Sequence, residues 1–104
     1  MASGSARPLE WSKAARRQLA EQIEYAASHG LAQPDRALGR VEAAAKIIER
    51  FPGIGTRGRS AGTREWPIKN SPLTLVYCIR AKKVVVLAVV HQRSVLRNSI
   101  RSVG

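Results

Sequence analysis

Apolar residues recur at helical spacing in two stretches of the chain, with charged residues between them. In the first stretch the apolar positions are Ala15, Leu19, Ile23, Ala26 and Ala27. This three-and-four spacing is typical of an amphipathic helix with one buried face. Ser12 is a suitable N-cap before the stretch, and Gly30 suits the position just after its last turn. The pattern therefore predicts a first helix over about 12–29.

The second apolar stretch has the same period and its own start and stop signals. Its apolar positions are Ala37, Leu38, Val41, Ala44, Ala45, Ile48 and Phe51. Pro34 and Asp35 suit a first helical turn, whereas Pro52 and Gly53 end a helix. We predict a second helix over 35–51. Because the link between the two helices is short, we expect them to form an antiparallel hairpin.

The period then changes from helical spacing to residues typical of β-strands. The runs are 64–68 (REWPI), 73–80 (LTLVYCIR) and 84–91 (VVVLAVVH), with turn residues between them. Such short runs joined by tight turns predict a three-stranded antiparallel meander. Residues 7–11 predict a further edge strand before the first helix. The resulting β-α-α-β-β-β order indicates an α+β fold, a small antiparallel sheet with the helical hairpin packed on one face.

The strand sequences also predict a register and a place in the sheet. Residues 84–90 alternate little, so we expect that strand to be central and covered on both faces. A two-residue turn at Ala81-Lys82 would put Arg80 and His91 on one face of the hairpin, at opposite ends. Tyr77 would then lie on the other face, among core residues.

Composition limits the classes of protein that need to be considered. The 104 residues are 44% hydrophobic, which predicts one domain over 1–104, with its core at about 7–92 and a basic tail over 93–104. With one cysteine and two histidines, we expect no disulfide, no metal and no cofactor. No apolar run is long enough for a bilayer, and we see no secretory signal. A cytoplasmic location, without membrane association, is expected.

Positive charge is concentrated in the second half of the chain. The formal net charge is +11, of which residues 1–50 contribute +2 and residues 51–104 contribute +9. Glu65 is the only acid of the second half. Such a field attracts phosphate backbones or an acidic protein partner, although a basic surface kept for solubility has the same composition.

The stretch 53–60 (GIGTRGRS) matches two phosphate-loop patterns in part. Both patterns need a strand before the glycines and a helix after them, so that the helix N-terminus faces the phosphate. Here a predicted helix precedes the glycines and a predicted strand follows, and Arg59 stands where one pattern has lysine. We therefore predict a helix stop followed by a flexible crossover that carries arginines.

Several short sequence motifs, taken together in their order along the chain, resemble those of the RelE/ParE superfamily of toxins from bacterial type II toxin–antitoxin systems. They are 9–12 (LEWS), 50–55 (RFPGIG), 62–65 (GTRE), 71–72 (SP), 76–80 (VYCIR) and 89–93 (VVHQR). The likeness extends over roughly residues 9–95, and it depends on the order and the spacing of these motifs together. The fold that it implies agrees with the element order predicted above.

The resemblance implies one of two activities. RelE-like members cleave messenger RNA on the ribosome, ParE-like members inhibit DNA gyrase, and an antitoxin neutralises both. The VHQR motif at the end of the last predicted strand resembles the ParE-like branch. The lysines in the second half, which fall in apparent turns, and the lack of an aromatic residue after Tyr77 depart from the RelE-like branch. We expect a ParE-like inhibitor of DNA gyrase that arrests growth. The alternatives are a metal-independent, ribosome-dependent endoribonuclease and a chain that is no longer toxic.

Candidate site residues follow from the charge and from the resemblance. The expected target-binding residues are Arg57, Arg59, Arg64, Arg80, His91, Arg93 and Arg97. For RNA cleavage the candidates are Arg64, Arg80 and His91, with Glu65 as a possible base. Arg64 and Glu65 have a structural alternative, a simple ion pair across strands. The expected partners are a cognate acidic antitoxin and either DNA gyrase or the ribosome with its message.

Overall fold

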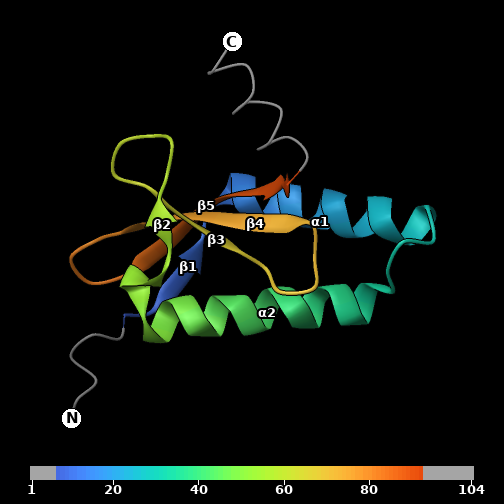
Figure 1. Cartoon of the computed structure of the whole chain (residues 1–104), viewed down its shortest axis with the longest axis horizontal. Helices are drawn as coiled ribbons and strands as arrows, with labels where there is room; N and C mark the ends of the chain where they lie inside the picture. Colours follow the sequence, from blue (N-terminus) through green and yellow to red (C-terminus); the bar gives the residue numbers. More distant parts are fainter. Residues whose placement is uncertain (1–6, 93–104) are drawn as a thin grey trace.

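Two helices pack on one face of a five-stranded sheet in the computed structural model, which describes residues 7–92 (Figure 1). The elements are β1 (Leu9–Trp11), α1 (Lys13–Ser28), α2 (Pro34–Arg50), the 3-10 helix η2 (Pro52–Ile54), β2 (Thr56–Arg57), β3 (Arg64–Pro67), β4 (Leu73–Ile79) and β5 (Val84–His91). The strand order is β1-β5-β4-β3-β2. β1 runs parallel to β5, and all other neighbours are antiparallel. The predicted α+β fold is confirmed.

The ends of both helices lie within two residues of the predicted ones. The Ser12 side chain accepts a hydrogen bond from the amide three residues later, so it caps α1 as expected. After α1, Gly30 has a φ of 66°, where a residue without Cβ is favoured. The amides of Gly30 and Leu31 donate to carbonyls of the last turn at 3.1 and 2.8 Å, a Schellman arrangement. α2 begins at Pro34, one residue earlier than predicted.

The sheet contains one strand that the sequence pattern did not predict. β2 has only two residues and pairs with β3 inside the segment expected to be a flexible crossover. Two residues are too few to show alternation, so periodicity alone does not detect such a strand. The predicted meander corresponds to β3, β4 and β5, and the predicted edge strand corresponds to β1.

A β-bulge changes the predicted register of the central hairpin. β4 and β5 keep the expected pairing from the turn to Tyr77, after which β5 contains one extra residue, Leu87. His91 therefore pairs with Leu73, on the face that the helices cover. The prediction that His91 shares a face with Arg80 is wrong, because a bulge inverts the alternation of every residue beyond it.

α1 supplies the hydrogen bonds that stabilise this bulge. The Ser12 hydroxyl donates to the carbonyl of Leu87 at 3.1 Å, and the Gln18 side-chain oxygen accepts from the amide of Val89 at 2.9 Å. Both backbone groups lie beyond the end of β1, where β5 has no strand partner on that side within residues 7–92. The helix thus satisfies the polar groups that an unpaired strand edge would leave open.

Replacing Gln18 with alanine should lower the free energy of unfolding by about 1 kcal/mol, because the partly buried Val89 amide loses its acceptor. Chemical denaturation measures the change. Arg17→Ala is the matched control, since Arg17 is exposed on the same helix and no side-chain hydrogen bond or ion pair joins it to β5 in the described chain. Equal stability of the two variants would contradict the role assigned to Gln18.

The core lies between the helices and the sheet. Its buried members are Ala15, Val41, Ala44, Ile48, Ile68, Leu73, Leu75, Tyr77, Val84, Val86 and Val89, with Trp11, Leu19 and Trp66 packed against them. Of the core residues predicted on the helices, Val41 and Ile48 are fully buried, whereas Ile23 is half-buried. β5 is an inner strand, but its residues outside this core are only partly covered, so the predicted burial of both faces is incomplete.

Candidate functional site

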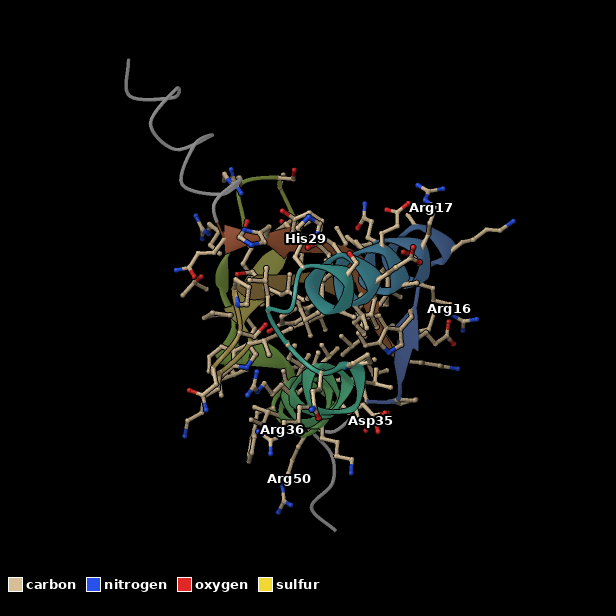
Figure 2. The ribbon with its side chains drawn as sticks, turned by 90° about the vertical axis from the view of Figure 1, so that its right-hand side faces the viewer. Arg16, Arg17, His29, Asp35, Arg36 and Arg50 are labelled. Carbon is tan, nitrogen blue, oxygen red and sulfur yellow. The ribbon has the colours of Figure 1, made fainter. Side chains whose placement is uncertain are left out.

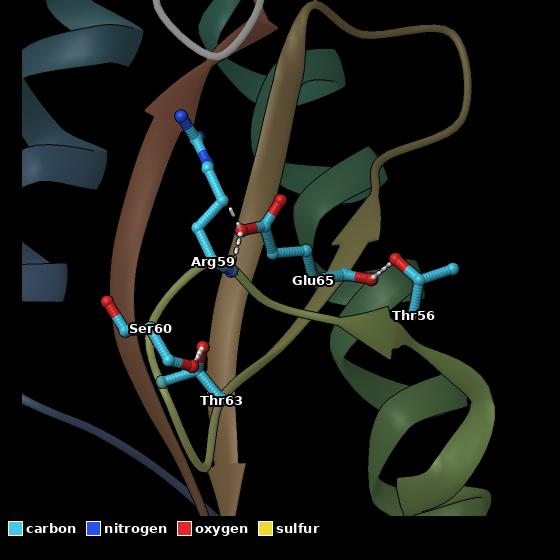
Figure 3. A network of polar contacts seen from close by, with 5 residues as sticks. All are labelled: Thr56, Arg59, Ser60, Thr63 and Glu65. Carbon is cyan, nitrogen blue, oxygen red and sulfur yellow. Dashed lines mark hydrogen bonds and ion pairs between the residues drawn. The ribbon is translucent and has the colours of Figure 1, made fainter. Parts of the chain in front are cut away.

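The chain between α2 and β3 forms a loop that is closed by its own hydrogen bonds. The Gly58 amide donates to the carbonyl of Thr63 at 2.8 Å. The Thr63 hydroxyl donates to the carbonyl of Ser60 at 2.7 Å (Figure 3). The segment predicted to be a flexible crossover therefore has a defined shape, and its arginines have defined positions relative to the sheet.

Tyr77 ties the start of this segment to the core. Its buried hydroxyl donates to the carbonyl of Pro52 at 2.6 Å and accepts from the amide of Gly55 at 2.9 Å. Burial raises the pKa of Tyr77, while the Gly55 amide and the nearby Arg64 charge act in the opposite direction. Tyr77 is a core residue as predicted. Its role in holding the loop was missed, because nothing in the sequence signals that contact.

Arg64 holds the same segment from β3. Its Nη1 atom donates to the carbonyl oxygen of Gly55 at 2.7 Å and to that of Gly53 at 3.4 Å. The Nε and Nη2 atoms of Arg64 have no partner within residues 7–92. One part of this guanidinium group is thus structural, and the other part is available to a ligand.

Arg57 lies directly opposite Arg64. The two residues are paired between β2 and β3, so their side chains emerge from the same face of the sheet. Arg57 is exposed and forms no ion pair or side-chain hydrogen bond with the described part of the chain. Like charges directly opposite one another on paired strands are unfavourable. The sequence did not predict this arrangement, because it depends on β2.

Glu65 lies on the other face of β3 and holds Arg59. One carboxylate oxygen of Glu65 accepts from the Arg59 amide at 3.3 Å and lies 3.7 Å from Nε of the same residue (Figure 3). Glu65 therefore pairs with an arginine of the loop and not with Arg64, its neighbour in β3. This contact positions the loop and leaves Arg57 and Arg64 without a counter-charge.

These residues line an open groove of about 590 Å³ at one end of the sheet. The lining residues are Arg57, Gly58, Arg59, Ala61, Gly62, Thr63, Arg64 and Ile79. Three of them are arginines, and none is acidic or aromatic. The sequence predicted all three arginines as target-binding residues, and the structure brings them together. We call this feature the arginine groove.

The other predicted site residues lie elsewhere. Arg80 is exposed beside the turn between β4 and β5, and its amide donates to the carbonyl of Lys83 at 2.8 Å. His91 lies seven residues along β5 from that turn, about 23 Å at the usual rise of a strand. It lines a different cavity, of about 150 Å³, beside α1 and the start of α2. Arg93 and Arg97 lie outside the described residues.

Comparison with known proteins agrees with this arrangement of elements. Residues 9–96 match the family model described as the ParE toxin of the type II toxin–antitoxin system parDE. The chain belongs to the ParE toxin family. The resemblance to the RelE/ParE superfamily that the sequence predicted is thereby confirmed, and the chain is a toxin of a ParE-type toxin–antitoxin system. None of the curated proteins matches the chain significantly.

Two solved structures share the fold of this ParE-family toxin. One is the chromosomal ParDE toxin–antitoxin system from P. aeruginosa, with a TM-score of 0.72, 17% identity, and coverage of 85% of this chain and 98% of that chain. The other is the toxin–antitoxin complex RelBE2 from Mycobacterium tuberculosis, with a TM-score of 0.60, 24% identity, and coverage of 85% and 93%. At such identities the likeness concerns the fold.

Residues 7–92 of the ParE-family toxin contain neither a metal-binding cluster nor a membrane-spanning helix. No group of three His, Cys, Asp or Glu side chains in that range is arranged to hold a metal ion. None of the helices there is both long and apolar enough to cross a membrane. The arginine groove is accordingly the feature on which the functional proposal rests.

Proposed function

We propose that this ParE-family toxin arrests bacterial growth by binding DNA gyrase through the arginine groove, without breaking a covalent bond. One observation carries the proposal. Arg57, Arg59 and Arg64 meet at a single groove, whereas the residues that RNA cleavage would need do not meet. Inhibition by occupancy requires a charged surface of defined shape, which these arginines provide.

The alternative of RNA cleavage is less well supported by the geometry. A metal-free ribonuclease needs a base, an acid and a cation within hydrogen-bond reach of one phosphate. Arg80 lies beside the turn that precedes β5, and His91 lies at the far end of that strand. At the usual rise per residue, the two are about 23 Å apart. Arg64 pairs with Tyr77 of β4, whereas His91 pairs with Leu73, which lies four residues away along the same strand. These separations favour the binding mode over the catalytic one.

The proposed second partner is a cognate acidic antitoxin. The net charge of +11 favours association with an acidic chain. An apolar groove of about 390 Å³ between α1 and α2 suits the apolar face of an amphipathic segment. Its lining residues are Trp11, Arg16, Leu19, Ala20, Ile23, Leu38, Val41 and Glu42. The toxin–antitoxin systems that share the fold support this assignment.

A supercoiling assay with purified gyrase tests the proposed target. Adding the toxin in excess over gyrase should abolish supercoiling of relaxed plasmid, and prior addition of the cognate antitoxin should restore it. The physical reason is occupancy of gyrase by the arginine groove, so the toxin needs no cofactor or metal beyond those that the supercoiling reaction already contains. Unchanged supercoiling at excess toxin would refute gyrase as the target.

Primer extension on translated message provides the counter-test for RNA cleavage. During growth arrest by the induced toxin, we expect full-length extension products. Cuts at defined codon positions that disappear in a combined Arg80→Ala and His91→Ala variant would favour the ribonuclease instead.

A further inference from the structure

We infer that the arginine groove binds the phosphodiester backbone of nucleic acid directly, with no other protein required. The inference rests on the proposed function, because it assigns a chemical class of ligand to the surface proposed to meet the target. Phosphate oxygens accept paired hydrogen bonds from the planar fork of an arginine side chain. Three such side chains line the groove.

The pairing of Arg57 with Arg64 is the first observation in favour of an anionic ligand. Two arginines are paired directly across β2 and β3, and no acidic residue lines the groove that they share. Glu65, the only acid in the second half of the chain, contacts Arg59 from the opposite face of β3. A bound phosphate group would offset the repulsion that the protein itself leaves uncompensated.

The second observation is that hydrogen-bond donors are available in fixed positions. Nε and Nη2 of Arg64 have no partner in the described chain, although its Nη1 is held by two carbonyl groups. The amides of Ala61 and Gly62, which line the groove, also donate to no group within residues 7–92. Because the loop is closed by the Gly58–Thr63 hydrogen bond, little ordering of these donors is required on binding.

The composition of the groove favours a nucleic-acid backbone over a free nucleotide. No aromatic side chain lines it, so it lacks the aromatic platforms on which the bases of nucleotides most often stack. A backbone presents phosphates at regular spacing whatever its sequence, and it responds to the whole +9 field of the second half. An acidic protein would need several carboxylates placed to match, so it is the less favoured ligand. Binding should therefore be independent of sequence and sensitive to salt.

Binding of short nucleic acids to the purified full-length toxin, without gyrase, tests the inference. The probes are a duplex DNA of arbitrary sequence and a single-stranded RNA of equal length, each titrated over a range of salt concentrations. In Arg57→Glu, the slope of log affinity against log salt should become shallower for the lost phosphate contact, by about 0.9 on the duplex and by about 0.7 on the single strand. The same variant should unfold at an equal or higher temperature, because the introduced carboxylate would face Arg64 as an opposite charge.

Arg17→Glu is the matched control, because it makes the same change in net charge at an exposed position on α1. Arg17 lies on the helical layer (Figure 2) and does not line the groove. We expect its salt slope to stay at the wild-type value. Binding of DNA, of RNA or of both supports the inference, and the comparison between the two probes identifies the source of the phosphates.

Absence of binding to both probes would overturn the inference, and so would three further results. They are equal loss of affinity in Arg17→Glu and Arg57→Glu, an unchanged salt slope in Arg57→Glu, and competition by poly-glutamate as strong as that by DNA. Failure here is distinct from failure of the proposed function, since this assay contains no gyrase. A toxin that inhibits gyrase but binds no nucleic acid would refute only the inference, and the reverse result would refute only the gyrase proposal.

Discussion

Replacing Gly55 with alanine is expected to lower the free energy of unfolding by about 3 kcal/mol, the upper range for forcing an atom into a packed site. A Cβ atom at this position would lie 2.6 Å from the Tyr77 hydroxyl oxygen and 2.9 Å from the backbone oxygen of Glu65. The latter is backbone in the sheet and cannot rotate away. Because the φ of Gly55 is −70°, the cost comes from lack of space and not from backbone strain.

Gly53→Ala is the control for this prediction. Gly53 is exposed and lies two residues earlier in the same segment, where an added Cβ would meet nothing within 4 Å. Its free energy of unfolding, measured by urea denaturation, should stay within about 0.5 kcal/mol of the wild-type value. Equal destabilisation by both substitutions would show that the segment needs glycine for its backbone freedom, contrary to the close approach of Tyr77.

Removing the Tyr77 hydroxyl is expected to cost about 2 kcal/mol of stability at neutral pH. In Tyr77→Phe, the ring still fills the core, but the carbonyl of Pro52 and the amide of Gly55 both lose their partner. Both residues are buried, so water does not readily replace the hydroxyl. Val86→Ala, a core truncation in the neighbouring strand, provides a comparison in which no polar group is left unpaired.

The pH dependence distinguishes the hydroxyl from ordinary packing. Burial raises the pKa of Tyr77 above its usual value of 10.0, so the unfolded chain loses this proton at a lower pH than the folded protein does. Stability from this group is therefore complete below pH 10 and is lost as the pH rises from there through the folded pKa. The difference between wild type and Tyr77→Phe should shrink above about pH 10. A constant difference across that range would contradict the assignment.

Periodicity and capping residues were sufficient to predict the helices. Ser12 and Gly30 act through hydrogen bonds within a few residues of their own position, and such local effects can be recognised in sequence. The Leu87 bulge differs because it depends on Gln18, which is about seventy residues away in the chain and contributes from α1. No local pattern contains that information, so the predicted face of His91 was wrong.

The candidate site was predictable in composition and not in arrangement. Arg57, Arg59 and Arg64 stand out in sequence because the second half has one acid. Arg57 is placed opposite Arg64 by β2, and this strand is too short to produce an alternation of polar and apolar residues in the sequence. Arg64 has a structural role because its Nη1 atom donates to carbonyl groups of the segment after α2. The sequence alone does not indicate that this segment lies close to Arg64.

The extra residue in β5 also marks a position at which the strand can lose one residue without a change of register. Leu87 has no counterpart in β4, whereas its neighbours Val86 and Ala88 pair with the adjacent residues Tyr77 and Val76. Deleting Leu87 would therefore join Val86 directly to Ala88 and leave each residue from Ala88 to His91 opposite its present partner in β4. The loss of one residue at the bulge would thus preserve the face of the sheet that each remaining residue of β5 occupies.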